Sequence, residues 1–398
     1  MLVRTHKDFR LLWLAQVVSQ LGDKIYALTL AWWVLELTVS AEHPKGDASE
    51  VGYMLAVGAI AATAFGPWLG SLADRHSRRA LMIWADLARA LLCGVLAAMA
   101  MLGHGQMWAL YLIVFLLSVF NLLFNPATQA ILGSLVSEEE MTEALSVQQL
   151  TQDLCNLLGA AVGGALVALL GVRLGFAANA LTFVLSALCI ARISRRELPA
   201  PAPHEVSAKG LGFLKERPTI LGLLVIFCLA NFFLVPLFVL IPAVARIALD
   251  GSAWTLGLLE GALAGGSILA TFAVLKVKIA RLWIPLTAAI VINGLALLAM
   301  SATSSAVGMA VLLALTGACL AVVNVQFNAL LQKLTPDALK GRVFSLVETI
   351  ATACFPISYF LSGLAAESLS FSAIFLLCGV GVTLAGALVP AVPRIREL

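Results

Sequence analysis

MWALYLIVFLLSVFNLLFNPATQAILGSL, residues Met107–Leu135, contains no charged residue and consists mostly of large apolar side chains. Because a bilayer-spanning helix needs roughly 20 consecutive apolar residues, this stretch predicts a membrane span. The whole chain has the same character: 61% of its 398 residues are hydrophobic and only 12% are charged, with a mean hydropathy of +0.99. Soluble domains average about 25% charged residues. The composition therefore excludes a disordered chain, a coiled coil and a soluble nucleic-acid-binding domain.

Hydropathy along the chain predicts an all-α polytopic membrane protein with twelve spans. A polar stretch with three prolines, at 194–217, divides it into an N-terminal six-helix half, 1–193, and a C-terminal six-helix half, 218–398. The predicted spans are 10–37, 50–73, 80–103, 107–135, 143–170, 172–193, 218–248, 253–275, 282–303, 306–334, 342–367 and 370–393.

The basic residues predict the orientation of these spans. Of the 25 Lys and Arg residues, twenty fall on one side and three on the other, while Lys24 and Arg89 fall within spans. Lysine and arginine are enriched in cytoplasmic loops. The bias predicts a multi-pass protein with both termini and the linker 194–217 in the cytoplasm.

The two halves also resemble a repeat. A shift equal to half the chain length aligns Asn125 with Asn324 and Ser146 with Ser345. Two six-helix halves related by an axis along the membrane normal would place a solute site between them near the middle of the bilayer.

A short polar segment, GSLADRHSRR at 70–79, joins the second and third predicted spans. A small residue permits close helix approach, and an acid beside arginines at a helix end makes a contact that can form and break. The alternative is that the arginines only set the orientation. We expect a gating loop formed by Gly70, Asp74, Arg75, Arg78 and Arg79.

This segment resembles the loop signature of the major facilitator superfamily. FRLLWLAQ at 9–16, LGD at 21–23 and FNPA at 124–127 resemble its bacterial drug and siderophore efflux branch, which includes macrolide-efflux proteins and the enterobactin exporter. The resemblance covers essentially the whole chain. It implies the major facilitator fold, alternating access, a bacterial inner-membrane location, and a hydrophobic antibiotic or siderophore as substrate. Span 4 lacks the membrane arginine that many proton-coupled members use.

Acidic residues inside predicted spans are candidate proton carriers, because ionisable groups there are costly and usually functional. Asp23 shares a helix face with Gln16 and Gln20; it could instead be a structural partner of Lys24. Asp86 and Arg89, three residues apart, are expected to form a structural ion pair. We expect proton coupling at Asp23, Asp153, Glu260 and Glu348.

Amides and one tyrosine recur on single faces of other spans, which predicts the lining of a polar cavity. The alternative is that the amides join helices by hydrogen bonds. The expected cavity residues are Gln16, Gln20, Asp23, Tyr26, Asn121, Asn125, Gln149, Asn156, Asn231, Asn324 and Asn328.

Together these patterns and the resemblance predict a secondary active transporter that exports a small amphipathic solute, a hydrophobic drug or a siderophore, by alternating access in exchange for protons. A lysophospholipid or glycolipid flippase of the same fold is the alternative, and a membrane sensor is a third reading. The sequence shows no nucleophile–base set, metal-ligand cluster or phosphate loop, and its seven cysteines are scattered. We therefore expect no enzymatic activity, no cofactor or metal, and no nucleic-acid partner. The expected partners are the solute, protons and membrane lipid, and the expected state is a monomer.

Overall fold

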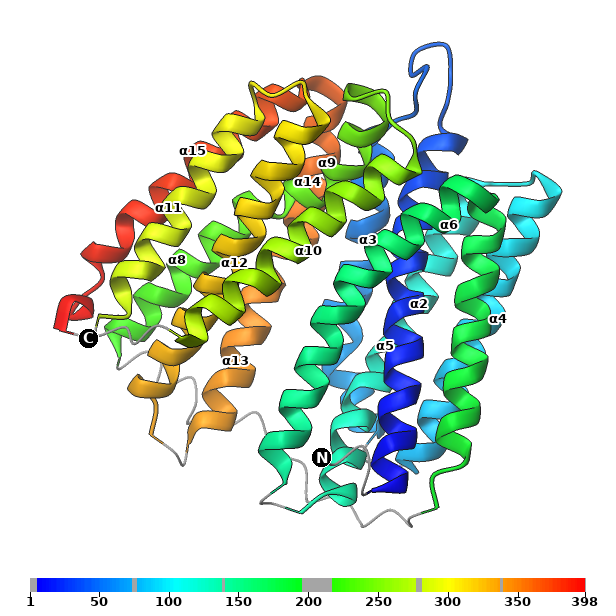
Figure 1. Cartoon of the computed structure of the whole chain (residues 1–398), viewed down its shortest axis with the longest axis horizontal. Coiled ribbons are helices and arrows are strands. Elements are labelled where there is room, and N and C mark those ends of the chain that lie inside the picture. The colour runs from blue at the N-terminus through cyan, green and yellow to red at the C-terminus, as the bar shows by residue number, and fades with distance from the viewer. Residues whose placement is uncertain are drawn as a thin grey trace. The chain divides into compact units, whose positions relative to one another are not determined.

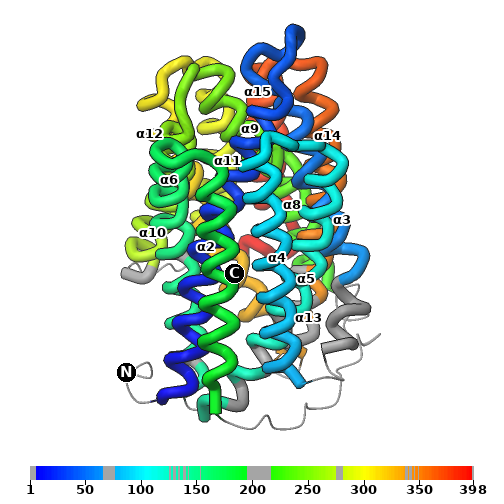
Figure 2. The backbone as a smooth tube through the Cα atoms, turned by 90° about the vertical axis from the view of Figure 1, so that its right-hand side faces the viewer, coloured from blue at the N-terminus to red at the C-terminus, as the bar shows by residue number. Residues whose placement is uncertain are grey.

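The computed structural model describes residues 6–73, 77–137, 140–194, 217–276, 281–336 and 339–397. Every regular element in these ranges is helical (Figures 1 and 2). The described chain divides into two compact units. Unit 1 comprises 1–46, 57–203 and 251–261, and unit 2 comprises 47–56, 204–250 and 262–398.

Unit 1 is built from five long helices. They are α2 (Lys7–Leu37), most of α3 (Ala48–Ala73), α4 (Arg78–Leu102), α5 (Met107–Leu135) and α6 (Met141–Ala191). Within α6, Gly171 has a φ of 79°, a left-handed backbone conformation that glycine adopts without steric cost. This residue separates the two spans predicted at 143–170 and 172–193.

The longest packing interface in unit 1 joins α2 to α6, and it depends on small residues. A Cβ atom at Gly22 would lie 2.0 Å from Thr182 Oγ1, and one at Gly175 would lie 2.3 Å from Thr29 Oγ1. Lipid tails are as apolar as the helices, so the hydrophobic effect does not drive membrane helices together. Their association depends on van der Waals packing instead, and glycine lets two backbones approach closely. The α2 face that carries the predicted polar residues is therefore held against α6.

Unit 2 contains the remaining helices, several of them interrupted. They are α8 (Pro218–Leu234), α9 (Pro236–Ala243), η1 (Val244–Ala248), α10 (Ala253–Lys276, mostly in this unit), α11 (Trp283–Met300), α12 (Ala306–Leu334), α13 (Lys340–Ala353), α14 (Phe355–Ser368), α15 (Phe371–Leu388), η3 (Val389–Ala391) and η4 (Ile395–Glu397). Helix α11 packs between α12 and α15, and α8 packs against α13 and α15 (Figure 1).

Two of the predicted spans are broken near prolines. The span 218–248 is divided into α8, α9 and η1 around Pro236, and the span 342–367 is divided into α13 and α14 before Pro356. Proline has no N–H for the helical hydrogen bond, so Pro236 cannot donate to the carbonyl of Phe232. That carbonyl instead accepts a hydrogen bond from Ser358 Oγ at 2.6 Å. The breaks therefore lie next to each other and are joined by a polar contact.

The first turns of α3 belong to unit 2, where they pack against α14. A Cβ atom at Gly52 would lie 2.7 Å from the backbone of Gly363, and Tyr53 donates a hydrogen bond to Glu367 Oε1 at 2.5 Å. The first turns of α10 belong to unit 1, where Gly257 approaches Gly164 of α6 as closely. Two helices thus contribute to both units.

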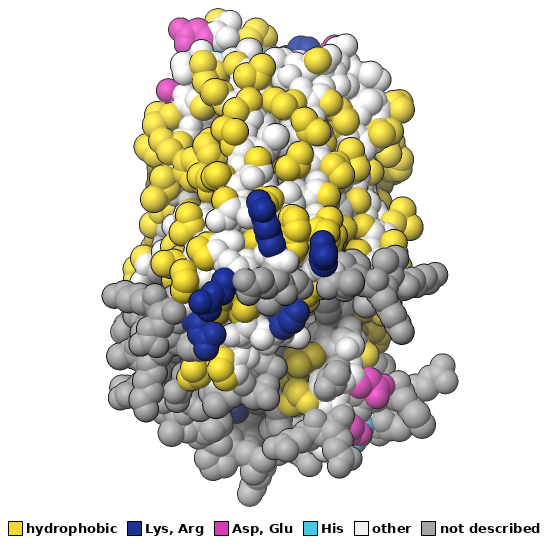
Figure 3. All heavy atoms as spheres, turned by 90° about the vertical axis from the view of Figure 1, so that its left-hand side faces the viewer, with side chains coloured by type: hydrophobic (Ala, Val, Ile, Leu, Met, Phe, Trp, Pro, Cys, Tyr) yellow, Lys and Arg dark blue, Asp and Glu magenta, His cyan; other side chains and the backbone are white. Residues whose placement is uncertain are grey.

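The outer surface of the helices is apolar. Leu169 is 82% exposed and Trp84 is 72% exposed. In the described part of the face drawn in Figure 3, hydrophobic side chains predominate and most of the Lys and Arg side chains lie near the middle of the view. Exposed apolar surface of this extent indicates contact with lipid. Ten helical stretches among the described residues are long and apolar enough to cross a membrane; α6 counts once among them although it holds two predicted spans. The predicted all-α membrane fold is confirmed.

Candidate functional site

The structure describes most, but not all, of the predicted site residues. Asp74 and Arg75 lie outside the described residues. Gly70, Asn125, Asp153 and Glu348 belong to described helices, but the surroundings of these four residues lie outside the description. The roles predicted for these six residues stay predictions.

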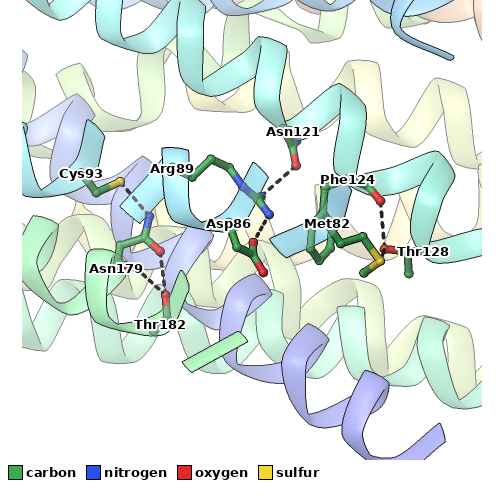
Figure 4. A network of polar contacts seen from close by, with 9 residues as sticks. All are labelled: Met82, Asp86, Arg89, Cys93, Asn121, Phe124, Thr128, Asn179 and Thr182. Atoms are coloured by element: carbon green, nitrogen blue, oxygen red, sulfur yellow. Dashed lines mark hydrogen bonds and ion pairs between the residues drawn. The ribbon is translucent and has the colours of Figure 1, made fainter. Parts of the chain in front are cut away.

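A buried ion pair forms the centre of a polar network in unit 1. Arg89 Nη2 bonds Asp86 Oδ1, and both side chains are almost fully buried, with exposures of 3% and 0%. Arg89 Nη1 also donates to Asn121 Oδ1 at 3.3 Å (Figure 4). A buried pair of charges is tolerated only when further hydrogen bonds compensate for lost hydration, and Asn121 supplies one such bond. The expected ion pair is confirmed. The predicted cavity residue Asn121 accepts a hydrogen bond from its arginine.

Two aromatic rings hold the guanidinium of Arg89 in place. The Cζ atom lies 4.5 Å from the centroid of the Phe124 ring on α5 and 4.3 Å from that of Phe183 on α6. Cations are attracted to the faces of aromatic rings within about 6 Å. Arg89 therefore carries a fixed positive charge where α4, α5 and α6 meet.

Asp23 interacts with this network from α2. Its carboxyl group has electrostatic interactions with Arg89, Asp86 and Lys24. Lys24 in turn interacts with Glu260, in the first turns of α10, and its stem lies against Gly159 of α6. Three acidic and two basic side chains of unit 1 are thus linked electrostatically, although they come from separate parts of the sequence.

The remaining polar groups of α2 surround this cluster. Gln16 Oε1 accepts a hydrogen bond from Gln148 Nε2 at 3.0 Å. Within the described part of the chain, Gln20 Oε1 and the Tyr26 hydroxyl are buried without a hydrogen-bond partner. Buried polar atoms normally have partners, so these two atoms are exceptions that a buried water molecule could satisfy.

The predicted cavity residues of α6 are less clearly placed. Gln149 is exposed and Asn156 is half-buried. A separate buried set lies in the second part of α6, where Asn179 Nδ2 contacts Cys93 Sγ at 3.5 Å and Thr182 Oγ1 donates to Asn179 Oδ1 at 2.9 Å (Figure 4). This set joins α4 to α6.

The two described arginines of the predicted gating loop lie at the start of α4. Arg79 Nε donates to the carbonyl of Ile190 at 3.2 Å, and its Nη2 bonds the carbonyl of Ala191. These are the last carbonyls of α6, where a cation also opposes the negative end of the helix dipole. Arg78 is 9% exposed. Arg79 therefore anchors the end of α6.

Unit 2 contains a cavity of about 450 Å³. Three predicted cavity residues, Asn231, Asn324 and Asn328, contribute to its wall. The remaining lining residues are mostly apolar or aromatic: Phe227, Phe327, Leu331, Phe344, Val347, Ala351, Thr352 and Phe355. An apolar pocket with a few polar groups is the usual form of a small-molecule site.

Two of the phenylalanines that line this cavity stack on each other. The rings of Phe227 and Phe327 stack with centroids 4.2 Å apart and an interplanar angle of 14°. Sequence reasoning missed these rings, although Phe227 lies four residues before Asn231 and Phe327 three residues after Asn324. That helical spacing was the signal that could have identified them.

No group of three or more metal-ligating side chains occurs among the described residues. The polar groups described above are amides, hydroxyls and paired charges. Such groups can bind an organic solute and exchange protons.

Several known proteins are similar to this chain over nearly its whole length. The macrolide efflux protein A of Streptococcus pyogenes is 26% identical over 98% of this chain and 97% of its own length. The multidrug efflux pump Tap of Mycobacterium bovis is 25% identical over 96% and 93%. The MFS-type transporter YfiS of Bacillus subtilis is 26% identical over 100% and 95%.

Solved structures show the same fold. A bacterial homologue of the iron transporter ferroportin superposes with a TM-score of 0.75 at 18% identity, covering 98% of this chain and 99% of its own. A bacterial homologue of the lysosomal transporter Spinster gives a TM-score of 0.76 at 14% identity, covering 98% and 97%. Residues 12–354 match the Major Facilitator Superfamily. The twelve-span sequence, the helical units and this match establish that the chain belongs to the Major Facilitator Superfamily.

Proposed function

We propose that this transporter exports a small amphipathic solute in exchange for protons. The observation that carries the proposal is the cavity of unit 2, where three asparagines and a set of phenylalanines line about 450 Å³. A site of this kind accommodates a solute with both polar and apolar parts. Export is inferred from the efflux relatives, the macrolide efflux protein A and Tap.

The position of the cavity in unit 2 is consistent with export. Its lining includes the last turns of α12 and the first turns of α13. The distribution of basic residues predicts that these helix ends lie on the cytoplasmic side. A solute could then enter from the cytoplasm or from the inner leaflet. We further propose that the protein works as a monomer in the bacterial inner membrane with both termini in the cytoplasm.

Proton exchange is assigned to the charged cluster of unit 1. The Asp23 carboxyl interacts electrostatically with Arg89, Asp86 and Lys24, so a change in its protonation changes the net charge of a partly buried cluster. Ionisable groups in this setting commonly form proton relays. The cluster adds Asp86 to the acids predicted from sequence, and Arg89 of α4 supplies a membrane arginine that bonds Asn121 of α5.

Proteoliposomes with an imposed pH gradient test this proposal. Internal pH is followed while a hydrophobic cation, a catecholate siderophore and a lysophospholipid are added in turn. Proton flux triggered by one solute, and lost in Asp23→Asn, supports the antiporter. Lysophospholipid crossing without proton flux, in wild type and Asp23→Asn alike, would replace it with the flippase.

A further inference from the structure

We propose that unit 2 binds the headgroup of an anionic phospholipid at the end where α8 and α11 begin and α15 ends. Four arginines of that end form the basic patch: Arg217, Arg281, Arg394 and Arg396. The inference goes beyond the proposed function, because it concerns a lipid that stays bound and not the solute that is moved. It is carried by the packed C-terminal segment, by the exposure of its arginines and by the apolar surface beside them.

The C-terminal segment that holds η3 and η4 is packed onto the start of α8. Thr219 Oγ1 donates a hydrogen bond to the carbonyl of Pro393 at 2.8 Å. A Cβ atom at Gly222 would lie 3.1 Å from Val392 Cγ1, and Ile395 is 0% exposed. A hydrogen bond and two buried apolar side chains thus fix the position of this segment.

Two exposed arginines flank the buried Ile395 in this segment. Arg394 and Arg396 are both exposed. Arg394 has a φ of 59°, a backbone conformation that is uncommon for residues other than glycine. Arg396 Nε donates to the carbonyl of Pro390 at 3.1 Å, which uses one of the five N–H groups of its guanidinium. The segment therefore presents two guanidinium groups at the surface, and one of them is held in place.

The start of α11 lies beside the same segment. A Cβ atom at Gly294 would meet Thr383 of α15, and one at Gly386 of α15 would meet Val291. Contacts that move back along α11 thus move forward along α15, so the two helices are antiparallel. The start of α11 at Trp283 therefore meets the end of α15, and α11 also packs against η3 (Figure 1).

Basic residues precede both helices that begin at this end. Arg217 directly precedes α8, Arg281 lies two residues before α11, and both are exposed. Within three residues of a patch arginine, the sequence holds two further basic residues and two acids: Lys215, Lys278, Glu216 and Glu397. On the face drawn in Figure 3, the Lys and Arg side chains near the middle have no Asp or Glu among them in the part that the structure describes. The patch therefore has an excess of positive charge, which suits a phosphate group.

Exposed apolar side chains continue from the patch along α15. Leu384 is 59% exposed and Leu388 is 51% exposed, and residues four apart lie on one face of a helix. Ile284 of α11 and Leu221 of α8 are exposed as well, and α15 packs against both helices. A phospholipid can cover this surface with its acyl chains while its phosphate meets the arginines, whereas a soluble phosphate compound cannot. The ligand that fits is therefore an anionic phospholipid.

Native mass spectrometry of the purified protein in detergent tests the inference with three probes. Dioleoylphosphatidylglycerol is anionic, dioleoylphosphatidylcholine has the same chains with a zwitterionic headgroup, and glycerol 3-phosphate has the phosphate without the chains. We expect phosphatidylglycerol to bind about tenfold more tightly than phosphatidylcholine, because several basic residues meet its headgroup. Glycerol 3-phosphate should bind most weakly.

Variants assign this preference to the basic patch. Arg394→Gln and Arg396→Gln should each weaken phosphatidylglycerol binding about fivefold, the contribution expected of one basic residue near an anionic headgroup. Phosphatidylcholine binding should stay unchanged, which also shows that the apolar surface is intact. Arg394→Lys keeps the charge and should retain more of the affinity than Arg394→Gln.

The matched control is Arg10→Gln. Arg10 is exposed in the first turn of α2, in unit 1, so this variant removes the same charge away from the patch. It should leave phosphatidylglycerol binding unchanged. Should the C-terminal variants not fold, Arg281→Gln tests the patch from α11, with the same fivefold loss expected.

Four results would overturn the inference. Phosphatidylglycerol binding no tighter than phosphatidylcholine binding would remove the headgroup preference. An equal loss in Arg10→Gln and Arg394→Gln would show that only the net charge of the protein matters. Glycerol 3-phosphate binding as tight as phosphatidylglycerol binding would make this a site for soluble phosphates. Unchanged phosphatidylglycerol binding in the patch variants would place the lipid elsewhere.

Discussion

Ser358→Ala tests how the two broken helices of unit 2 are held together. Pro236 has no N–H, so the carbonyl of Phe232 loses its helical partner. Ser358 Oγ replaces it at 2.6 Å, and the serine is only 2% exposed. Removing the hydroxyl leaves a buried carbonyl without a donor at the place where α8 ends.

The structure also supplies a matched control one turn further along α14. Ser362 is 3% exposed and donates to the carbonyl of Ser358 at 2.5 Å. That carbonyl belongs to a continuous helix and keeps its backbone hydrogen bond when the hydroxyl is removed. Ser362→Ala therefore deletes the same atom without leaving an unpaired carbonyl.

The two variants should differ in the free energy of unfolding. An unpaired buried acceptor costs about 1–3 kcal/mol, whereas interhelical hydrogen bonds in membrane proteins average only about 0.6 kcal/mol. We expect Ser358→Ala to lose about 1–2 kcal/mol, because the carbonyl of Phe232 then has no other donor. Ser362→Ala should lose under about 0.5 kcal/mol, since the helix retains its own bond.

Equilibrium unfolding in mixed micelles, followed by circular dichroism, measures both losses under identical conditions. Equal losses in the two variants would refute the reasoning, because the hydroxyl would then contribute in the same way at a broken and at an intact helix. No loss in Ser358→Ala would show that another donor or a water molecule serves the Phe232 carbonyl.

Three further predictions address unit 1. Gly22→Ala should destabilise the protein by about 1–3 kcal/mol, because the added methyl group overlaps α6 at the α2–α6 interface. Gly94→Ala is the control: its Cβ would meet nothing within 4 Å, so this variant should be neutral or stabilising. Thermal unfolding of the two variants compares them. Asp86→Asn should lower the free energy of unfolding by about 3–5 kcal/mol, because it leaves the Arg89 charge buried and unpaired. The double variant Asp86→Asn with Arg89→Gln should lose less stability. A double variant that is no more stable than Asp86→Asn would contradict this. Hydrogen bonds from Ser137 and the contact with His6 hold the pKa of Glu140 below its usual 4.5. This contribution is present above that value and is lost as the pH falls through the lower folded pKa. The protection factor of the Ser137 amide, which donates to Glu140 Oε2, should therefore fall in acid in the wild type and be independent of pH in Glu140→Gln, when each rate is divided into the intrinsic rate at the same pH.

The spans could be predicted closely from sequence because hydropathy is a local property. The predicted span 107–135 coincides with α5, and the span 306–334 coincides with α12. The helix breaks at 235 and 354 could not be predicted from the prolines alone. A proline within a membrane helix can be tolerated when a neighbouring group donates a hydrogen bond to the freed carbonyl. Ser358 is such a group, and it lies more than a hundred residues from Phe232.

The candidate site was only partly predictable. Asn231, Asn324 and Asn328 were among the expected cavity residues, the last two because of their helical spacing, and all three line one cavity. Periodicity could not pair Phe227 with Phe327, since that stack depends on how α8 packs against α12.

The sequence by itself determined that this protein is a helical membrane protein, where its helices run and which positions carry polar groups, because these properties follow from the hydropathy and period of each segment. Only the tertiary structure decided which polar groups meet. It placed Asp23 of α2 near Arg89 of α4 and Lys24 near Glu260 of α10. Such meetings depend on close packing at residues such as Gly22, where the absence of one carbon atom sets the distance between helices.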